Sequence, residues 1–313
     1  MLNIFGSIPK NLGPWFRIGT CSWKYDTWKG LVYDQGKTYR ADDYLADYAR
    51  SFDSVEVDQW FWSLFPSQVK LPEPRTVRQY AASVPESFLF TVKAPNALTL
   101  THFYSQKTGR HGDMAGMPNT HFLDADLLKQ FLDRLSPLGR KLGPIMFQFE
   151  YLNKQKMPSR EAFFESLDGF FQRAPAGFSY AIESRNPNYL SPPLFRFLEE
   201  RRLGFVYLEG YYMPHISQVF EAHKPATADF CVIRLHGGDR LEIETETGEV
   251  WDRIVAPKPE AVAAAARIVR HNARRKVLTY VNLNNHFEGS APLTARRLLI
   301  ALEESKESDL GDS

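Results

Sequence analysis

Polar and charged residues recur at every second position near the ends of short apolar segments. In residues 54–59 (SVEVDQ), Glu56 and Asp58 alternate with Val55 and Val57. Five further segments place polar pairs on one face in the same way, namely Thr91 and Lys93, Gln148 and Glu150, Glu183 and Arg185, Arg234 and His236, and Asn282 and Asn284. Because strand side chains alternate between two faces, and burying unpaired polar groups costs free energy, the pattern predicts a polar pocket where these segments converge.

The cations of this set suggest that the pocket binds an anion. Arg234 is the first candidate, because the planar fork of a guanidinium matches carboxylate and phosphate geometry. Arg185 and Lys93 would hold the same anion from neighbouring segments. Gln148 would contribute an amide to substrate binding. We therefore expect a small, anionic ligand as the partner.

The carboxylates and the histidine supply groups that could transfer protons. Glu183 or Glu56 would act as general base or acid, with a pKa set by burial beside the cations. His236 would be the partner acid, because imidazole titrates near neutral pH. Asn284 and Asn285, at the tip of the last segment, would position the substrate.

Each of these residues also has a structural interpretation. Glu56 could form a salt bridge with Lys93, and Glu183 with Arg185 could belong to a structural ion network. His236 could be a structural or exposed histidine at a strand end. Asn-rich strand ends are also typical of turns and helix caps.

A metal site is the main chemical alternative. Glu56, Asp58, Glu150, Glu183 and His236 offer oxygen and imidazole ligands. The neighbouring lysine and arginines would neutralise these carboxylates and disfavour a bare cation, so we expect no required metal and no cofactor. The sequence also has no H-E-x-x-H, P-loop, G-x-S-x-G or C-x-x-C motif.

The elements that must position these residues alternate between strands and helices. Short segments rich in β-branched and aromatic residues begin near residues 17, 53, 88, 144, 178, 204, 230 and 276. Helical patterns occupy residues 41–50, 75–82, 123–135, 160–171, 193–202, 259–271 and 292–302. Eight such repeats predict a single-domain (β/α)₈ barrel, whose ligands bind at the carboxyl ends of the strands. An open doubly wound sheet is the alternative, but the Gly-rich phosphate loop that it favours is missing after the first strand.

The barrel is expected to span residues 17–304, after an N-terminal extension (1–16) and before a polar C-terminal tail (305–313). The long connection over residues 96–121, with His102, His111 and His121, would hang over the mouth as a lid. The connection over residues 237–257 alternates polar and apolar residues around Thr247-Gly248, which suggests a small hairpin.

Composition restricts the partners. The net charge of +1 gives no global field for nucleic acid or an anionic membrane. The two cysteines suggest no disulfide framework and a reducing compartment. The chain shows no signal-peptide pattern and no run of 18 apolar residues, so we expect a cytoplasmic protein that binds neither nucleic acid nor membrane. The oligomeric state stays open.

Motifs spread over nearly the whole chain resemble the DUF72 family, also called YecE-like. The matching blocks are Ile18–Tyr25, Tyr48–Val57, Val92–Pro95, Leu138–Gln148, Glu183–Tyr189, Arg234–Gly237 and Asn284–Gly289. The resemblance implies a (β/α)₈ barrel and no particular reaction, because the family has no assigned one. Trp23, in the first block, joins the candidate substrate-binding residues. The chain departs from the family pattern at Asp58, Asn186, Tyr189 and Asn282.

These observations favour an enzyme that acts by acid–base chemistry on a small anionic or polyhydroxylated substrate at the mouth. It would be a metal-independent hydrolase, lyase or isomerase. The alternatives are a metal-dependent barrel of the sugar isomerase or phosphodiesterase type, and a ligand-binding or regulatory protein without catalysis.

Overall fold

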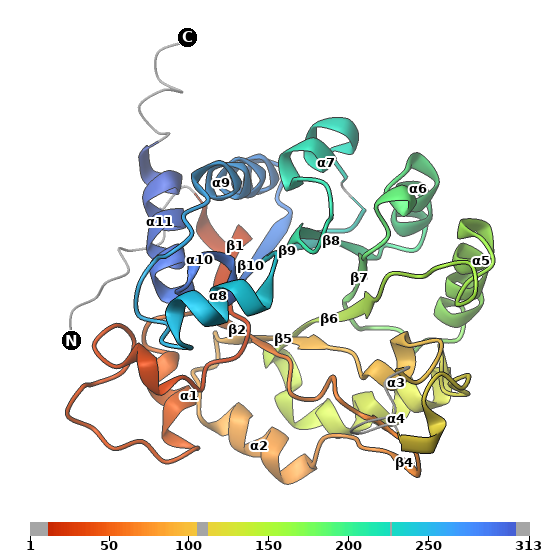
Figure 1. Cartoon of the computed structure of the whole chain (residues 1–313), viewed down its shortest axis with the longest axis horizontal. Helices are drawn as coiled ribbons and strands as arrows, with labels where there is room; N and C mark the ends of the chain where they lie inside the picture. Colours follow the sequence, from red (N-terminus) through yellow and green to blue (C-terminus); the bar gives the residue numbers. More distant parts are fainter. Residues whose placement is uncertain (1–11, 105–111, 226, 305–313) are drawn as a thin grey trace.

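The computed structural model describes residues 12–104, 112–225 and 227–304, and a ring of parallel strands lies at its centre (Figure 1). The sheet has eight strands in the order β1-β10-β9-β8-β7-β6-β5-β2. Their bounds are β1 Phe16–Thr20, β2 Ser54–Val57, β5 Leu89–Lys93, β6 Leu142–Phe149, β7 Tyr180–Ser184, β8 Gly204–Gly210, β9 Phe230–Gly237 and β10 Leu278–Leu283. The alternating pattern of the sequence therefore predicted the parallel sheet correctly.

The two edge strands close the ring through residues at their carboxyl ends. Cys21 and Glu56 form a parallel bridge, and the Ser22 amide donates to the Glu56 carbonyl at 3.1 Å. A Cβ added to Gly19 would lie 2.2 Å from the Ser54 carbonyl oxygen. Only glycine permits so close an approach of β1 to β2, so Gly19 is one physical reason why the barrel can close.

Helices surround the strands in Figure 1 and follow them in sequence, which confirms the predicted (β/α)₈ fold. The outer helices are α1 Asp43–Tyr48, α2 Pro74–Ala82, α4 Ala125–Leu135, α5 Arg160–Phe171, α6 Pro192–Glu200, α7 Ile216–His223, α9 Pro259–Arg274 and α11 Ala291–Glu304. Short helices in the connections are α3 Asn96–Thr99, α8 Arg240–Thr247 and α10 Asn285–Glu288. None of the helices in this described part of the chain has the length and apolar character needed to cross a membrane.

The apolar core has two parts, one on each side of the strands. The larger part lies between strands and helices and includes Val55, Val57 and Ile233, as the alternation predicts. A smaller apolar cluster contains side chains on the opposite strand face, namely Met146, Ala181, Val206, Phe230, Val232 and Tyr280. The inner apolar cluster, as we call it below, lies towards the amino ends of the strands.

The hairpin predicted around Thr247-Gly248 is wrong, because helix α8 occupies this segment. Asp239 caps its first turn by accepting hydrogen bonds from the amides of Leu241 (2.8 Å) and Glu242 (3.3 Å). Gly248 ends the helix in the left-handed conformation, with φ of 61°. An N-cap Asp and a C-terminal Gly are helix signals, and here they outweigh the polar–apolar alternation between them.

The long connection after β5 begins with helix α3, and His102 forms an antiparallel bridge with Pro118. His121 lies 3.9 Å from the carboxylate of Asp124 at the start of α4. His111 lies outside the described residues, as do the N-terminal residues 1–11 and the C-terminal residues 305–313. The predicted lid role stays a prediction.

Candidate functional site

The guanidinium of Arg234 lies at the centre of the polar end of the barrel and is only 1% exposed. Its Nε and Nη2 donate to the two carboxylate oxygens of Glu56 at 2.8 and 2.7 Å, which is the bidentate geometry of a strong ion pair. Its Nη1 donates to Gln148 at 3.2 Å and to the carboxylate of Glu183. One side chain of β9 thereby connects β2, β6 and β7. We call this set, with Asn282, the ionic layer.

Asn282 completes the ionic layer from β10. Its Nδ2 donates to Glu56 Oε2 at 3.1 Å and to Thr91 Oγ1 at 3.0 Å. Glu56 thus accepts three hydrogen bonds while it is fully buried. Such bonds offset the cost of removing a carboxylate from water.

The charges of the ionic layer stabilise one another. Burial alone would raise the pKa of Glu183, but the positive charges of Arg234, Arg185 and Lys93 outweigh it and lower this pKa. Burial alone would lower the pKa of Arg234, but Glu183 and Glu56 raise it well above its usual value. The guanidinium predicted to bind an external anion therefore makes its ion pairs with the protein's own carboxylates.

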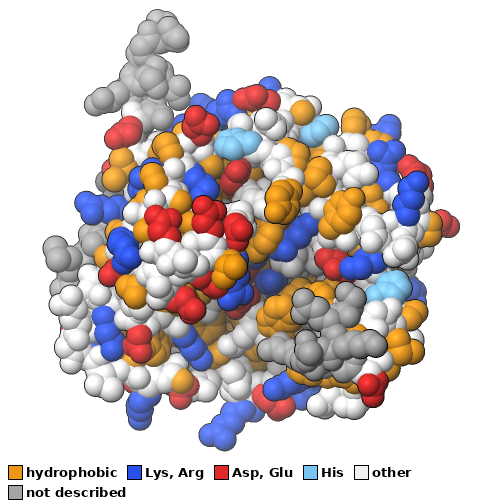
Figure 2. All heavy atoms as spheres, viewed as in Figure 1, with side chains coloured by type: hydrophobic (Ala, Val, Ile, Leu, Met, Phe, Trp, Pro, Cys, Tyr) orange, Lys and Arg blue, Asp and Glu red, His pale blue; other side chains and the backbone are white. Residues whose placement is uncertain are grey.

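Two other cations lie nearer to solvent. Arg185 is partly exposed, its Nε donates to Glu183 Oε1 at 3.0 Å, and its guanidinium lies 4.0 Å from the centre of the Tyr211 ring. Its terminal nitrogens make no hydrogen bond within the described ranges. The face seen in Figure 2 is hollowed at its centre, and blue Lys and Arg side chains gather there with red acidic ones.

Lys93, at the end of β5, is the second of these cations. Its Nζ lies 4.0 Å from the centre of the Phe61 ring. It forms no hydrogen bond or ion pair with any residue that the structure describes, so the alternative Glu56–Lys93 salt bridge is wrong. Burial and the charge of Arg234 lower its pKa to about 8, although Glu56, among other carboxylates, acts in the opposite direction.

His236 is a neutral imidazole at the edge of this site. Burial, followed by the charges of Arg234 and Arg185, lowers its pKa well below 6.5. Its Nε2 lies 3.3 Å from Asn284 Nδ2, and Asn284 Oδ1 accepts the His286 amide at 2.9 Å. This second bond fixes the orientation of the amide, so Nε2 accepts and the ring proton sits on Nδ1. A ring with so low a pKa is a weak base, and its acceptor nitrogen is already bonded to Asn284, so the acid role expected from the sequence stays a prediction.

The remaining predicted residues take part mainly in contacts within the protein. Gln148 belongs to the ionic layer, and Asn284 caps α10. Asn285 is 3% exposed, and its Oδ1 accepts the Ala291 amide at 2.9 Å at the start of α11. Trp23 is 1% exposed and packs edge-on against Tyr80, with ring centres 5.1 Å apart. Asn285 and Trp23 are thus buried in packing and capping contacts.

Comparison with known proteins identifies the family of the chain. The model of the family described as "Protein of unknown function DUF72" matches residues 17–312. The chain belongs to the DUF72 family. The resemblance inferred from the sequence motifs is therefore confirmed, and the family name carries no activity.

Relatives of this DUF72 protein include UPF0759 protein YecE of Escherichia coli K12, which is 26% identical over 253 residues, covering 75% of this chain and 78% of that protein. A similar solved structure is the DUF72 family protein TM1631 of Thermotoga maritima MSB8, with 22% identity, a TM-score of 0.65, and 93% and 99% of the two chains covered. Another is EF0366 of Enterococcus faecalis V583, with 18% identity, a TM-score of 0.64, and 92% and 95% covered. These two structures support the barrel fold.

In this DUF72 barrel, the sequence had offered Asp58 at the mouth only as a possible metal ligand, and it had not singled out the aromatic residues Phe61 and Tyr211. Asp58 has a pKa raised by burial and by the nearby Glu56, although Lys93 and Arg234 lower it in part. Phe61 and Tyr211 form the aromatic contacts of Lys93 and Arg185. The sequence signals were the position of Asp58, two residues after Glu56, and aromatic residues in the loops that follow strands.

The described residues contain no cluster of metal-binding side chains. Among them, no group of three or more His, Cys, Asp or Glu side chains is arranged to hold an ion. Glu56 and Glu183 bind Arg234, and Glu150 pairs with Lys156 at 2.7 Å.

Proposed function

We propose that this DUF72 protein is an enzyme that binds a small anionic substrate at the C-terminal mouth of its barrel and acts on it by proton transfer. The observation that carries the proposal is the environment of Lys93. Removing an ammonium group from water is costly unless an opposite charge compensates. The carboxylates near Lys93 offset this cost only in part, and none of the described residues pairs with its ammonium directly, so a ligand anion would supply the direct partner.

The anion would bind between Lys93 and the terminal nitrogens of Arg185. Arg185 is oriented by Glu183 at 3.0 Å and by the Tyr211 ring, which leaves its outer edge for a carboxylate or phosphate group. Arg234 would support this arrangement from below. It binds both glutamates and holds them in place, and so fixes Arg185 indirectly through Glu183.

Proton transfer would involve Asp58 and Lys93. The raised pKa of Asp58 and the lowered pKa of Lys93 both move towards neutrality, and such shifts are typical of groups that exchange protons in catalysis. The neutral His236 would donate a hydrogen bond to the substrate from its Nδ1. This chemistry serves hydrolysis, elimination or isomerisation.

A ligand-binding protein without turnover is the second candidate. The observation in its favour is that Arg234 engages both glutamates that the sequence marks as catalysts. Such saturated carboxylates are weak bases, so a pocket of this kind can bind an anion without transforming it.

Anion titration tests the binding step. We expect inorganic phosphate to bind the wild-type protein in calorimetry and to lose at least about tenfold in affinity in K93M, since a tenfold loss corresponds to about 1.4 kcal/mol. Lys129, exposed on α4, provides the control K129M, which should bind as wild type does. Equal phosphate affinity in all three proteins would refute the proposal.

Turnover separates the two candidates. A library of phosphorylated and carboxylated metabolites is incubated with wild type and D58N and followed by mass spectrometry. The enzyme proposal expects conversion of at least one compound, with D58N slower by about 10²–10⁴-fold. Binding without conversion of any compound that binds would establish the second candidate instead.

A further inference from the structure

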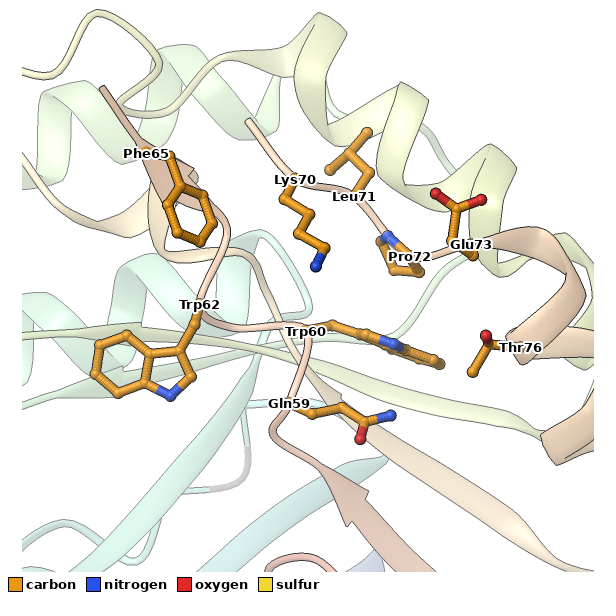
Figure 3. Close-up of a pocket in the computed structure, with 9 residues that line it drawn as sticks. All are labelled: Gln59, Trp60, Trp62, Phe65, Lys70, Leu71, Pro72, Glu73 and Thr76. Atoms are coloured by element: carbon orange, nitrogen blue, oxygen red, sulfur yellow. The ribbon is translucent and has the colours of Figure 1, made fainter. Parts of the chain in front are cut away.

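An aromatic groove opens beside the mouth, between the loop after β2 and the start of α2 (Figure 3). Its volume of about 690 Å³ lies within the usual range for small-molecule sites. The residues around it are Gln59, Trp60, Trp62, Phe65, Lys70, Leu71, Pro72, Glu73 and Thr76. None of them belongs to the ionic layer, so the groove is a separate feature of the same face.

The walls of the groove are held rigidly. Asn96 Oδ1 accepts the amides of Ser63 at 2.9 Å and Leu64 at 2.8 Å, and the Asn96 amide donates to the Phe61 carbonyl at 2.7 Å. Trp60 stacks on Tyr80 with ring centres 5.8 Å apart. Strand β3 (Leu64–Phe65) pairs with β4 (Gln68–Val69) to form the far wall. A preorganised site loses little entropy when a ligand binds.

The groove combines aromatic faces with hydrogen-bonding groups at their edges. Trp62 is 47% exposed, and Figure 3 shows Lys70 reaching into the space between Trp62 and Trp60, with Gln59 beside them. The indole face carries partial negative charge, which complements the partly positive C–H groups on one side of a pyranose ring. The hydroxyl groups of such a ring would bond with Lys70 and Gln59.

The charges of the groove favour a neutral ring at this position. Lys70 and Glu73 carry opposite charges on the same wall, so the wall attracts neither anions nor cations as a class. A plain hydrocarbon would leave both charged groups without partners where it covered them. A sugar ring satisfies the aromatic surface and the polar edge together.

A short chain of contacts joins the groove to the anion site. The rings of Phe61 and Trp62 meet edge to face with centres 5.1 Å apart, and Phe61 in turn lies 4.0 Å from the ammonium of Lys93. One aromatic ring therefore stands between the ammonium and the exposed indole. We infer from these two contacts that one ligand with a sugar ring and an acidic group would contact both.

We propose that the groove is a sugar-binding subsite and that the substrate is an anionic carbohydrate, a sugar phosphate or a uronic acid. Its ring packs on Trp62, and its anionic group binds Lys93 and Arg185. This inference rests on the proposed function for the anion half of the ligand, whereas the groove supplies the sugar half.

The test compares inorganic phosphate with a panel of neutral hexoses, their phosphates, and hexuronic acids. Affinities are measured by calorimetry on the full chain and on W62A, W62F and F178A. Phe178, 39% exposed, precedes β7 at the opposite end of the barrel and serves as the matched control. We expect at least one anionic sugar to bind wild type tenfold more tightly than phosphate does.

The variants then assign the sugar half to the groove. W62A should lose at least tenfold in affinity for that sugar while its affinity for phosphate stays within twofold. W62F should recover part of the loss, and F178A should match wild type.

The outcomes that overturn the inference differ from those that overturn the proposed function. If phosphate binds through Lys93 but no anionic sugar binds more tightly, or if W62A binds the sugar as wild type does, the sugar subsite is refuted and the anion site stands. If neither phosphate nor any anionic sugar binds wild type, both proposals are refuted.

Discussion

The interior of the barrel has two layers built by the same strands, and the two differ completely in chemistry. The inner apolar cluster includes Met146, Ala181, Val232 and Tyr280. Two residues further along each strand, on the same face, the ionic layer has Gln148, Glu183, Arg234 and Asn282. Two adjacent layers of one barrel are thus buried in different ways, one by apolar packing and the other by ion pairs and hydrogen bonds.

The difference shows which of the two layers contributes less to the stability of the fold. Apolar side chains stabilise a barrel interior by leaving water and by close packing. Buried ion pairs contribute little net stability, because desolvation offsets their attraction, and they are costly to disrupt. The ionic layer is therefore better explained by what it supports at the mouth, Arg185 above all, than by stability.

Disrupting the ionic layer should cause the largest loss of unfolding free energy. We expect R234M to lower the free energy of unfolding by about 3–5 kcal/mol, because Glu56 and Glu183 would be left buried without their cation. Urea denaturation measures it. The triple variant E56Q/E183Q/R234M should recover much of the loss. A single variant as stable as wild type would contradict the coupling of these charges.

Breaking the inner apolar cluster should cost somewhat less. M146A removes a side chain that is 1% exposed and should lower the free energy of unfolding by about 3 kcal/mol, through lost burial and the cavity left behind. The same urea experiment applies. If M146A cost more than R234M, the apolar layer would be the more sensitive of the two.

Asn282 separates the effect of hydrogen bonding from that of charge, because it lies in the ionic layer and is uncharged. N282L removes the bonds to Glu56 and Thr91, but it also removes a buried amide oxygen that makes no hydrogen bond with the described residues. We expect a loss of about 1 kcal/mol in unfolding free energy. A loss as large as that of R234M would mean that hydrogen bonding, and not charge, holds the layer.

Replacing Lys93 should change the free energy of unfolding in the opposite direction. Its pKa is about 8 in the folded protein against a usual 10.5, so the folded state disfavours the charged form. This penalty is fully present below pH 8 and disappears as the pH rises from 8 to 10.5. The free energy of unfolding of K93M should therefore exceed that of wild type at pH 7, by at most about 3 kcal/mol, since one pKa unit corresponds to about 1.4 kcal/mol, and the difference should shrink at pH 10. Denaturation at both pH values measures it, and a constant difference would contradict the lowered pKa.

Much of the site could be predicted because strand alternation is a local rule. The period of two places Glu56, Glu183, Arg185 and Arg234 on inner faces near the carboxyl ends of their strands, and closure of the sheet brings them together. The pairing within that set could not be predicted. Lys93 and Arg234 are both cations on inner faces, and only the positions of their side chains decide which one neutralises Glu56.

The failures have related causes. The segment at Leu241 alternates like a strand, yet capping at Asp239 and Gly248 makes it a helix. Asn285 is a residue type that often contacts ligands, yet its side-chain oxygen accepts the Ala291 amide at the start of α11. In both cases a specific hydrogen bond, rather than the pattern of residue types, decides the outcome.

The sequence by itself determined the barrel, the family and the polar end of the strands, because periodicity and motif order depend only on neighbours along the chain. The tertiary structure decided that Arg234 forms ion pairs with the protein's own carboxylates, whereas Lys93 forms none with the residues that the structure describes. It also decided that aromatic residues after β2 form a groove, since both outcomes depend on distances between segments that are remote in sequence.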